Sequence, residues 1–243
     1  MSPNRPKVPV VPRGDLTVIV RQDDGSNRIA HEEEEYTFAC ELRNSARVMS
    51  NFAKATEDGP DTHWQLRGFI HGAIILSYSA LEAALNEVIH LHALTSESLL
   101  DEAERRVIYA IGQENLMPRG ESNTLQKFNL VLRLLSKSEI KTSDPAYQNA
   151  NLVRMLRNML VHPLPGRVTT FVDTDDFDYS SQQQIVKKLR SALRLKKSAT
   201  FPKDVITKEC ASWAVHSCEK FLHAFVVASG VDIGFLTASS LNK

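Results

Sequence analysis

The segment from His63 to Leu94 limits the possible folds of this chain most strongly, because it predicts a long helix that is apolar on nearly all of its sides. From Phe69 to Val88 the sequence runs FIHGAIILSYSALEAALNEV, and its apolar residues cover most of the circumference of an ideal helix. A surface helix has one apolar stripe, whereas a helix of this kind is buried in the centre of a bundle. We therefore expect other helices to pack around this segment.

Helical periodicity also recurs in the rest of the chain. In residues 31–55 an apolar face is predicted at spacings of four, four, three and four; it consists of Phe38, Leu42, Ala46, Met49 and Ala53. Further helices are predicted at 96–111, 123–135, 145–161, 182–197 and 203–229. The packing residues expected in the last of them include Phe221, Leu222 and Phe225. Taken together, these segments predict a single all-α helical bundle at residues 31–230.

The two ends of the chain differ in composition from the helical part. Residues 1–15 are rich in proline and polar side chains, and LTVIVR at 16–21 is β-branched, which favours a short strand or an extended segment. We therefore expect residues 1–30 to form a short extended N-terminal arm and residues 231–243 to form a C-terminal tail.

The bulk composition excludes several classes of protein. The chain has 29 basic and 29 acidic residues among 243, so it lacks the strong basic excess of a dedicated duplex-DNA binder. Cys40, Cys210 and Cys218 show no CxxC spacing, which argues against a disulfide framework and a structural zinc site. We expect a cytoplasmic protein with no metal and no cofactor. The longest apolar run, at 69–76, contains His71 and predicts no membrane span.

Several polar side chains lie at the end of the leucine-rich helix predicted at 145–161. The stretch RMLRNMLVHP runs from Arg154 to Pro163, and its proline cannot continue a helix. Asn158 and His162 are four residues apart and share a face, whereas Arg157 points about 140° away from His162. The negative end of the helix dipole favours a protonated His162, which suits acid–base chemistry, and the guanidinium of Arg157 could bind a phosphate.

The central helix carries a polar row of its own. Tyr78, Glu82, Asn86 and His90 recur every four residues, and burying such a row is costly unless its members are paired. We expect Arg157 or Arg154 of a neighbouring helix to be the cation that pairs with Glu82. The row is interpreted as a structural polar network, which could also orient Arg157.

These two stretches together resemble the HEPN superfamily, an all-α family. Many of its members carry an arginine followed by a polar residue and, after four to six residues in all, a histidine. RNMLVH supplies Arg157, Asn158 and His162 for that motif, and SALEAALNEV is similar to an earlier family helix with a small-x-x-Glu pattern. The resemblance is close over residues 73–86 and 152–163, and elsewhere extends only to helical character.

The resemblance implies a metal-independent endoribonuclease that acts as a toxin or an anti-phage defence effector. In active members two protomers bring their motifs together, and the 2′-hydroxyl of the RNA attacks the adjacent phosphate. His162 would be the acid–base group, Arg157 would hold the phosphate, and Asn158 would orient His162 or a phosphate oxygen. The implied partners are RNA, a second copy of the chain and a regulatory or antitoxin protein. Other members lack catalysis, so the alternative is a non-catalytic dimerisation or binding module.

The segment 180–203 is strongly basic within an otherwise neutral chain. It contains seven lysines and arginines and no acidic residue. If it is helical throughout, one face carries cations at i, i+3, i+7 and i+10; these are Lys187, Arg190, Arg194 and Lys197. The segment is either a solvated helix face or a surface on which an RNA backbone rests.

Overall fold

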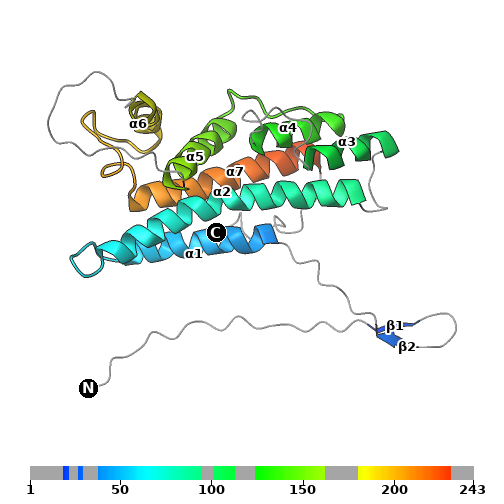
Figure 1. Ribbon diagram of the computed structural model, residues 1–243, viewed down its shortest axis with the longest axis horizontal. Helices are drawn as coiled ribbons and strands as arrows, with labels where there is room; N and C mark the ends of the chain where they lie inside the picture. The colour runs from blue at the N-terminus through cyan, green and yellow to red at the C-terminus, as the bar shows by residue number, and fades with distance from the viewer. Residues whose placement is uncertain are drawn as a thin grey trace. The chain divides into compact units, whose positions relative to one another are not determined.

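The structure is a computed structural model, and it describes residues 19–21, 27–29, 38–94, 101–112, 124–161 and 180–230. The chain divides into two units, Met1–Tyr36 and Thr37–Lys243. In the described part of the second unit all regular structure is helical, so the predicted all-α class is confirmed (Figure 1).

The first unit contains a small antiparallel hairpin. Strand β1 (Ile19–Arg21) pairs with strand β2 (Asn27–Ile29), with Ile19 opposite Ile29 and Arg21 opposite Asn27. Of the two alternatives predicted for residues 16–21, a short strand or an extended segment, the structure has the strand. Its partner is not predicted from the sequence, because NRI carries little β-branched character of its own.

Seven helices lie in the described part of the second unit. The helices predicted at 63–94 and 145–161 have the predicted bounds, and the one predicted at 123–135 is one residue shorter at each end, as helix ends commonly vary. The helices predicted at 96–111, 182–197 and 203–229 are five or six residues shorter at one end than expected. The helices are α1 (Phe38–Ala55), α2 (His63–Leu94), α3 (Glu102–Gly112), α4 (Thr124–Leu134), α5 (Pro145–Val161), α6 (Ser180–Ala192) and α7 (Lys208–Ser229).

Helix α2 is the centre of the bundle, as its apolar circumference predicts. It contacts α1, α3, α4, α5 and α7, and Figure 1 shows it between α1 on one side and α7 on the other. Ile74, Leu81 and Ala84 are fully buried along it. Each fully buried aliphatic side chain contributes roughly 1.5–3 kcal/mol relative to an exposed one, so α2 organises most of the core.

An aromatic cluster joins α4 to α7 in the core. The ring of Phe128 meets those of Phe221 and Phe225 edge-on, with centroids 5.3 and 4.7 Å apart. Such edge-to-face pairs add about 0.5–1.5 kcal/mol to the burial of their area. Phe221, Leu222 and Phe225 are buried, which confirms three of the packing residues predicted for the last helix.

The predicted apolar face of α1 is partly wrong. The buried residues recur at spacings of four, three, four and three, and they are Ala39, Arg43, Ala46, Ser50 and Ala53. Phe38, by contrast, is 54% exposed. Four of the five buried side chains are small, which lets the backbone of α1 approach that of its neighbour α2 closely. The predicted face instead included large apolar side chains.

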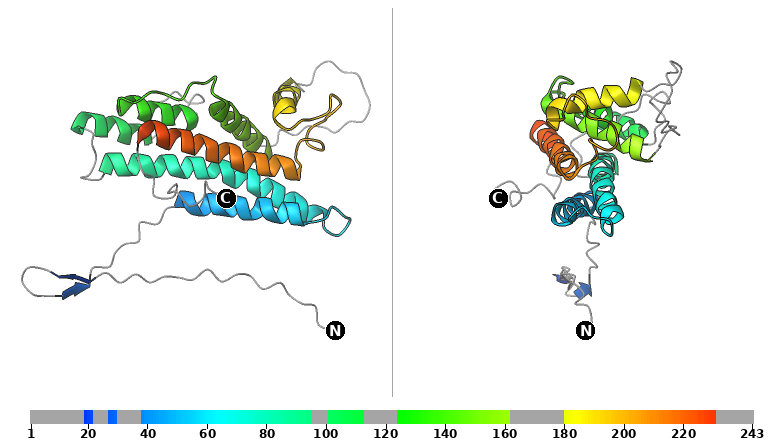
Figure 2. Two further views of the ribbon diagram at one scale, coloured as in Figure 1. Left: turned by 180° about the vertical axis from the view of Figure 1, so that it is seen from behind. Right: turned by 90° about the vertical axis from the view of Figure 1, so that its left-hand side faces the viewer.

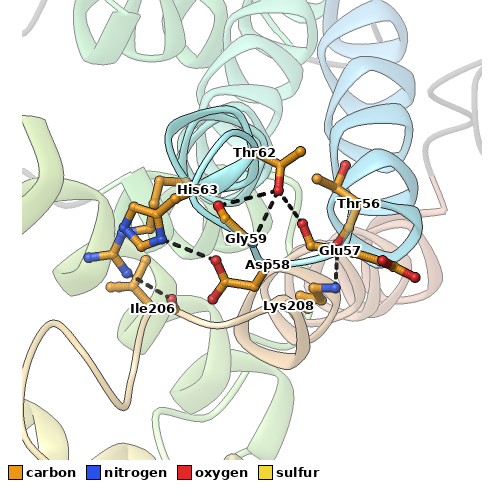
Figure 3. Close-up of polar contacts among 9 residues, drawn as sticks. Thr56, Glu57, Asp58, Gly59, Thr62, His63, Ile206 and Lys208 are labelled. Carbon is orange, nitrogen blue, oxygen red and sulfur yellow. Dashed lines mark hydrogen bonds and ion pairs between the residues drawn. The ribbon is translucent and has the colours of Figure 1, made fainter.

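The turn between α1 and α2 is fastened to the start of α7 (Figure 3). The ammonium of Lys208 donates to the carbonyl of Thr56, and Arg67 Nη1 donates to the carbonyl of Ile206 over 3.2 Å. Thr62 Oγ1 accepts from the amide of Gly59 over 3.1 Å and so closes the turn. These contacts fix the α1–α2 pair against α7 at one end of the bundle.

The apolar run at 69–76 predicts no membrane span, but helix α2 as a whole passes the test of length and composition for one. Its stretch His63–His90 contains a window of 18 residues with a mean hydropathy of 1.4. Half of that window is buried inside the bundle, and the core helix of a globular domain has the same composition. Length and mean hydropathy therefore do not distinguish a core helix from a membrane helix.

The register of α1, that is, which of its residues face the core, can be tested with the same substitution at two nearby positions. Ala53 is fully buried and Ala55 is exposed. We expect Ala53→Leu to lower the free energy of unfolding by about 1–3 kcal/mol through overpacking, and Ala55→Leu to change it by less than about 0.5 kcal/mol. Urea denaturation measures both, and equal effects would contradict the observed register of α1.

Candidate functional site

The candidate site lies in the last turns of α5. This helix starts at Pro145 because Asp144 caps it, with Oδ1 accepting from the amide of Ala146 over 2.7 Å, and because proline is favoured in a first helical turn. Helix α5 buries Tyr147, Ala150, Val153 and Leu156. Arg154, Arg157 and Asn158 lie beside this buried set and are half-buried.

Arg157 pairs with Glu82 of the central helix. Arg157 Nη2 lies 3.6 Å from Glu82 Oε2, and the two side chains are 23% and 38% exposed. Of the two cations expected to pair with Glu82, Arg157 is therefore the one that does so. Arg154 instead donates from Nε to Asn151 Oδ1 over 2.9 Å on its own helix.

The Arg157–Glu82 pair is weak by its geometry. A separation of 3.6 Å is an ion pair without a good hydrogen bond, and pairs with this much exposure contribute about 0–1 kcal/mol. Within the described residues, Arg157 Nε is buried and has no hydrogen-bond partner. The side chain of Arg157 is 23% exposed, so an incoming phosphate could reach the guanidinium, and leaving Glu82 would cost little.

Asn158 contacts its neighbour Arg157. Asn158 Oδ1 accepts from Arg157 Nη1 over 3.2 Å, so the amide oxygen helps to hold the guanidinium. The family resemblance implies that Asn158 orients His162 or a phosphate oxygen. The geometry adds a third role for Asn158, that of positioning Arg157, which helical spacing alone does not indicate.

His162 lies outside the described residues, so its predicted position beside Asn158 stays a prediction. The described part of α5 extends to Val161, directly before the histidine. Val161 itself is 39% exposed. The described end of α5 therefore reaches the surface of the bundle.

The polar row on α2 is only partly buried. Tyr78 is 2% exposed, whereas Asn86 and His90 are exposed, so the row leaves the core between Tyr78 and Asn86. Burial raises the pKa of the Tyr78 hydroxyl above its usual value, and the Thr124 hydroxyl acts in the opposite direction. Tyr78 is thus a neutral phenol at physiological pH, and Glu82 stands at the boundary between the core and solvent.

The basic segment does not form the predicted continuous helical face. Helix α6 ends at Ala192, and Arg194 adopts a φ of +52°. Arg190 Nη2 donates to the carbonyl of Lys197 over 3.1 Å, which ties the following turn to the helix. The chain leaves the helix after Ala192 because Leu193 and Leu195 both pack against the core. Residues two positions apart lie on different sides of a helix, so a continued helix could not direct both leucines to the core.

Several cations of this segment nevertheless remain exposed. They lie on α6, which packs against α5, and on the turns that follow it. Figure 2 shows α5 and α6 on the same side of the bundle. The exposed cations are Lys187, Lys188, Arg194, Lys196, Lys197 and Lys203.

The other chemically active groups of the described residues form no second centre. No three of the histidines, cysteines and acids lie close enough to hold a metal ion in the part of the chain that is described. Burial raises the pKa of Cys210 to about 12 and also raises the pKa of Cys218. Both thiols therefore stay protonated and act as core side chains.

A small cavity lies between α1, α2 and α7, and no pattern in the sequence indicates it. It has a volume of about 10 Å³ and is lined by Arg43, Ser77 and Glu219, among others. A cavity of this size holds at most one water molecule. It is therefore a structural feature of the core rather than a binding site.

The weakness of the Arg157–Glu82 pair can be tested by stability. We expect Glu82→Gln to lower the free energy of unfolding by no more than about 1 kcal/mol. Glu139→Gln is the matched control, because Glu139 pairs with Arg133 on the surface. A decrease of about 3–5 kcal/mol from Glu82→Gln alone would show a buried structural bridge.

Comparisons with protein-family models, with curated proteins and with solved structures find no match for this chain. The candidate site therefore rests on the residues of this chain and on their geometry.

Proposed function

We propose that this protein is a metal-independent endoribonuclease of HEPN type, with Arg157, Asn158 and His162 as its catalytic group. The observation that supports the proposal best is the state of Arg157. Its guanidinium is half-buried at the surface end of α5, weakly paired with Glu82, and retains an unpartnered Nε within the described residues. A cation held in this way suits a phosphate that arrives transiently.

The proposed reaction needs only groups of the protein and of the RNA. His162 takes the proton of a 2′-hydroxyl, whose oxygen attacks the adjacent phosphorus. The bond from phosphorus to the 5′-oxygen of the next nucleotide breaks, and that oxygen takes up a proton from the acid–base group. Arg157 balances the charge that builds up on the phosphate oxygens, and Asn158 holds Arg157 in place. The products are a 2′,3′-cyclic phosphate and a free 5′-hydroxyl.

The surroundings of the site fit an RNA substrate. The exposed cations of the basic segment lie on and after α6, which packs on α5, and an RNA backbone attracts such groups by release of counterions. In this proposal two copies of the chain combine in the cytoplasm, and a regulatory or antitoxin protein restrains a toxin or defence effector.

A second candidate function is a non-catalytic dimerisation or binding module. The hydrogen bond from Arg157 to Asn158 and the ion pair with Glu82 favour it, because a polar helix end that only stabilises the bundle would form the same contacts. The two functions differ in whether RNA is cut.

The ribonuclease proposal predicts cleavage of RNA in the presence of EDTA, with cyclic phosphate ends. We expect His162→Ala and Arg157→Ala each to slow cleavage by about 100-fold or more, since acid–base groups and charge-stabilising donors each contribute that much. Arg133→Ala is the control, because Arg133 pairs with Glu139 on the surface. Absence of cleavage by the unaltered chain, or equal rates in all three variants, would exclude this function.

The exposed cations predict a salt-dependent affinity for RNA. The triple variant Lys187→Glu, Lys188→Glu and Lys196→Glu should bind RNA more weakly, and the slope of log K against log salt should flatten by about 0.7 for each phosphate that the variant no longer neutralises. The exposed Lys54 of α1 gives the control Lys54→Glu. Fluorescence anisotropy measures both quantities, and an unchanged affinity would refute an RNA-binding role for this segment.

A further inference from the structure

Arg154 lies on α5 one helical turn before Arg157 and Asn158, and no step of the proposed reaction uses it. Each residue of an ideal helix is rotated by about 100° from the one before it, so Arg157 lies about 60° to one side of Arg154 and Asn158 about 40° to the other. Residues three and four apart are neighbours on a helix surface. The side chain of Arg154 is therefore adjacent to both residues of the candidate site.

The guanidinium of Arg154 lies near the central helix α2, as that of Arg157 does. Burial is the main cause that raises the pKa of Tyr78, the carboxylate of Glu82 raises the same pKa, and the guanidinium of Arg154 lowers it. Both charged groups therefore lie within electrostatic reach of the Tyr78 hydroxyl. Since Arg157 contacts Glu82 directly, the two arginines of α5 lie opposite two successive turns of α2.

The terminal nitrogens of Arg154 are accessible to a ligand. In the described part of the chain, its hydrogen bond runs from Nε to Asn151 Oδ1 over 2.9 Å, and none of the ion pairs includes it. No nitrogen of Arg154 is both buried and without a hydrogen-bond partner within the described residues, so Nη1 and Nη2 contact solvent. Asn151 holds the guanidinium on its Nε side, which leaves the two terminal nitrogens to donate parallel hydrogen bonds.

The charges near the end of α5 favour an anion. Arg154 and Arg157 are neighbouring cations on one helix, which repel each other, and Glu82 pairs with Arg157 alone among the described residues. The half-buried guanidinium of Arg154 has lost part of its hydration without gaining an opposite charge there. A phosphate supplies that charge and accepts two parallel hydrogen bonds from one guanidinium.

We propose that Arg154 binds a second phosphate of the RNA, next in the strand to the phosphate that Arg157 holds. The Cβ atoms of residues at i and i+3 are about 5–6 Å apart, a separation that two long arginine side chains can match to neighbouring phosphates of one strand. The proposal rests on the ribonuclease function and adds a property of its substrate, because a bond flanked by a second phosphate is preferred over an isolated one. Arg154 does not contact the reacting atoms, so it contributes to substrate affinity and not to the chemical step.

A substrate with a single cleavable bond tests this role. An oligonucleotide that has one 2′-hydroxyl and 2′-O-methyl groups elsewhere can be cut only at the phosphate that follows the free hydroxyl. Replacing the phosphate on its 5′ side or on its 3′ side by a neutral methylphosphonate should raise KM about tenfold or more on one of the two sides, because a hydrogen bond between charged groups is lost. The value of kcat should stay nearly constant, since this phosphate does not react.

The variant Arg154→Gln separates phosphate binding from a structural role. It should cut the three substrates with the same KM, and Arg154→Lys should keep part of the preference because lysine is a cation without the guanidinium fork. Arg133→Gln is the control, because Arg133 pairs with Glu139 on the surface. A variant Arg154→Gln that still prefers the fully charged substrate, or an unaltered chain that has no preference, would overturn the proposal.

Binding of uncleavable dinucleotides distinguishes failure of this site from failure of the proposed function. The probes are 2′-O-methylated uridine dinucleotides with the bridging phosphate alone or with an added 5′- or 3′-terminal phosphate, titrated into the full chain and followed by NMR. We expect one added phosphate to lower the dissociation constant about tenfold or more, and Arg154→Gln to remove that gain while Arg133→Gln retains it. A gain without cleavage of any RNA would contradict the ribonuclease function but support the site. Equal affinity for all three probes, or no binding, would overturn the site whether or not RNA is cut.

Discussion

The burial of α2 is the constraint on which the rest of the structure depends. Nearly every side of this helix is apolar, so it has to be surrounded, and α1, α3, α4, α5 and α7 all contact it. Glu82 interrupts its apolar surface at the boundary with solvent, 38% exposed. The same helix that organises the core therefore also presents the carboxylate that meets Arg157. The candidate site therefore lies where the apolar surface of α2 ends and the carboxylate of Glu82 stays partly hydrated.

The partial burial and weak pairing of Arg157 connect the structure to the proposed chemistry. A fully buried ion pair would hold the guanidinium too firmly, because each charge would lose its only compensation when the pair opened. The side chain of a fully exposed arginine would populate many rotamers. The observed state lies between these limits, with Asn158 as a short-range support and Glu82 as a weak partner. This arrangement can offer a positioned cation to a phosphate without a large cost of release.

The sequence predicts the elements better than the faces they present. The bounds of α2 and α5 follow from strong periodicity and from prolines that start or stop a helix. The predicted seam of α1 is misplaced because close packing selects small side chains such as Ala39 and Ser50 over larger ones, and this choice depends on the partner helix. The predicted end of α6 is misplaced because Leu193 and Leu195 both have to reach the core. The contacts of Arg157 depend on the distance between two helices, which no local pattern encodes.

The most direct test of the central claim is to observe the guanidinium of Arg157 itself while RNA binds. The arginine ¹H–¹⁵Nε resonance can be followed by NMR during titration with a short RNA whose 2′-hydroxyls are methylated, so that it binds without being cut. The account predicts a large shift of the Arg157 resonance and slower exchange of its Nε proton, because a bound phosphate would replace Glu82 as the partner of the guanidinium and would hold the side chain in place. An Arg157 resonance that stays unchanged while RNA saturates the protein would contradict the account.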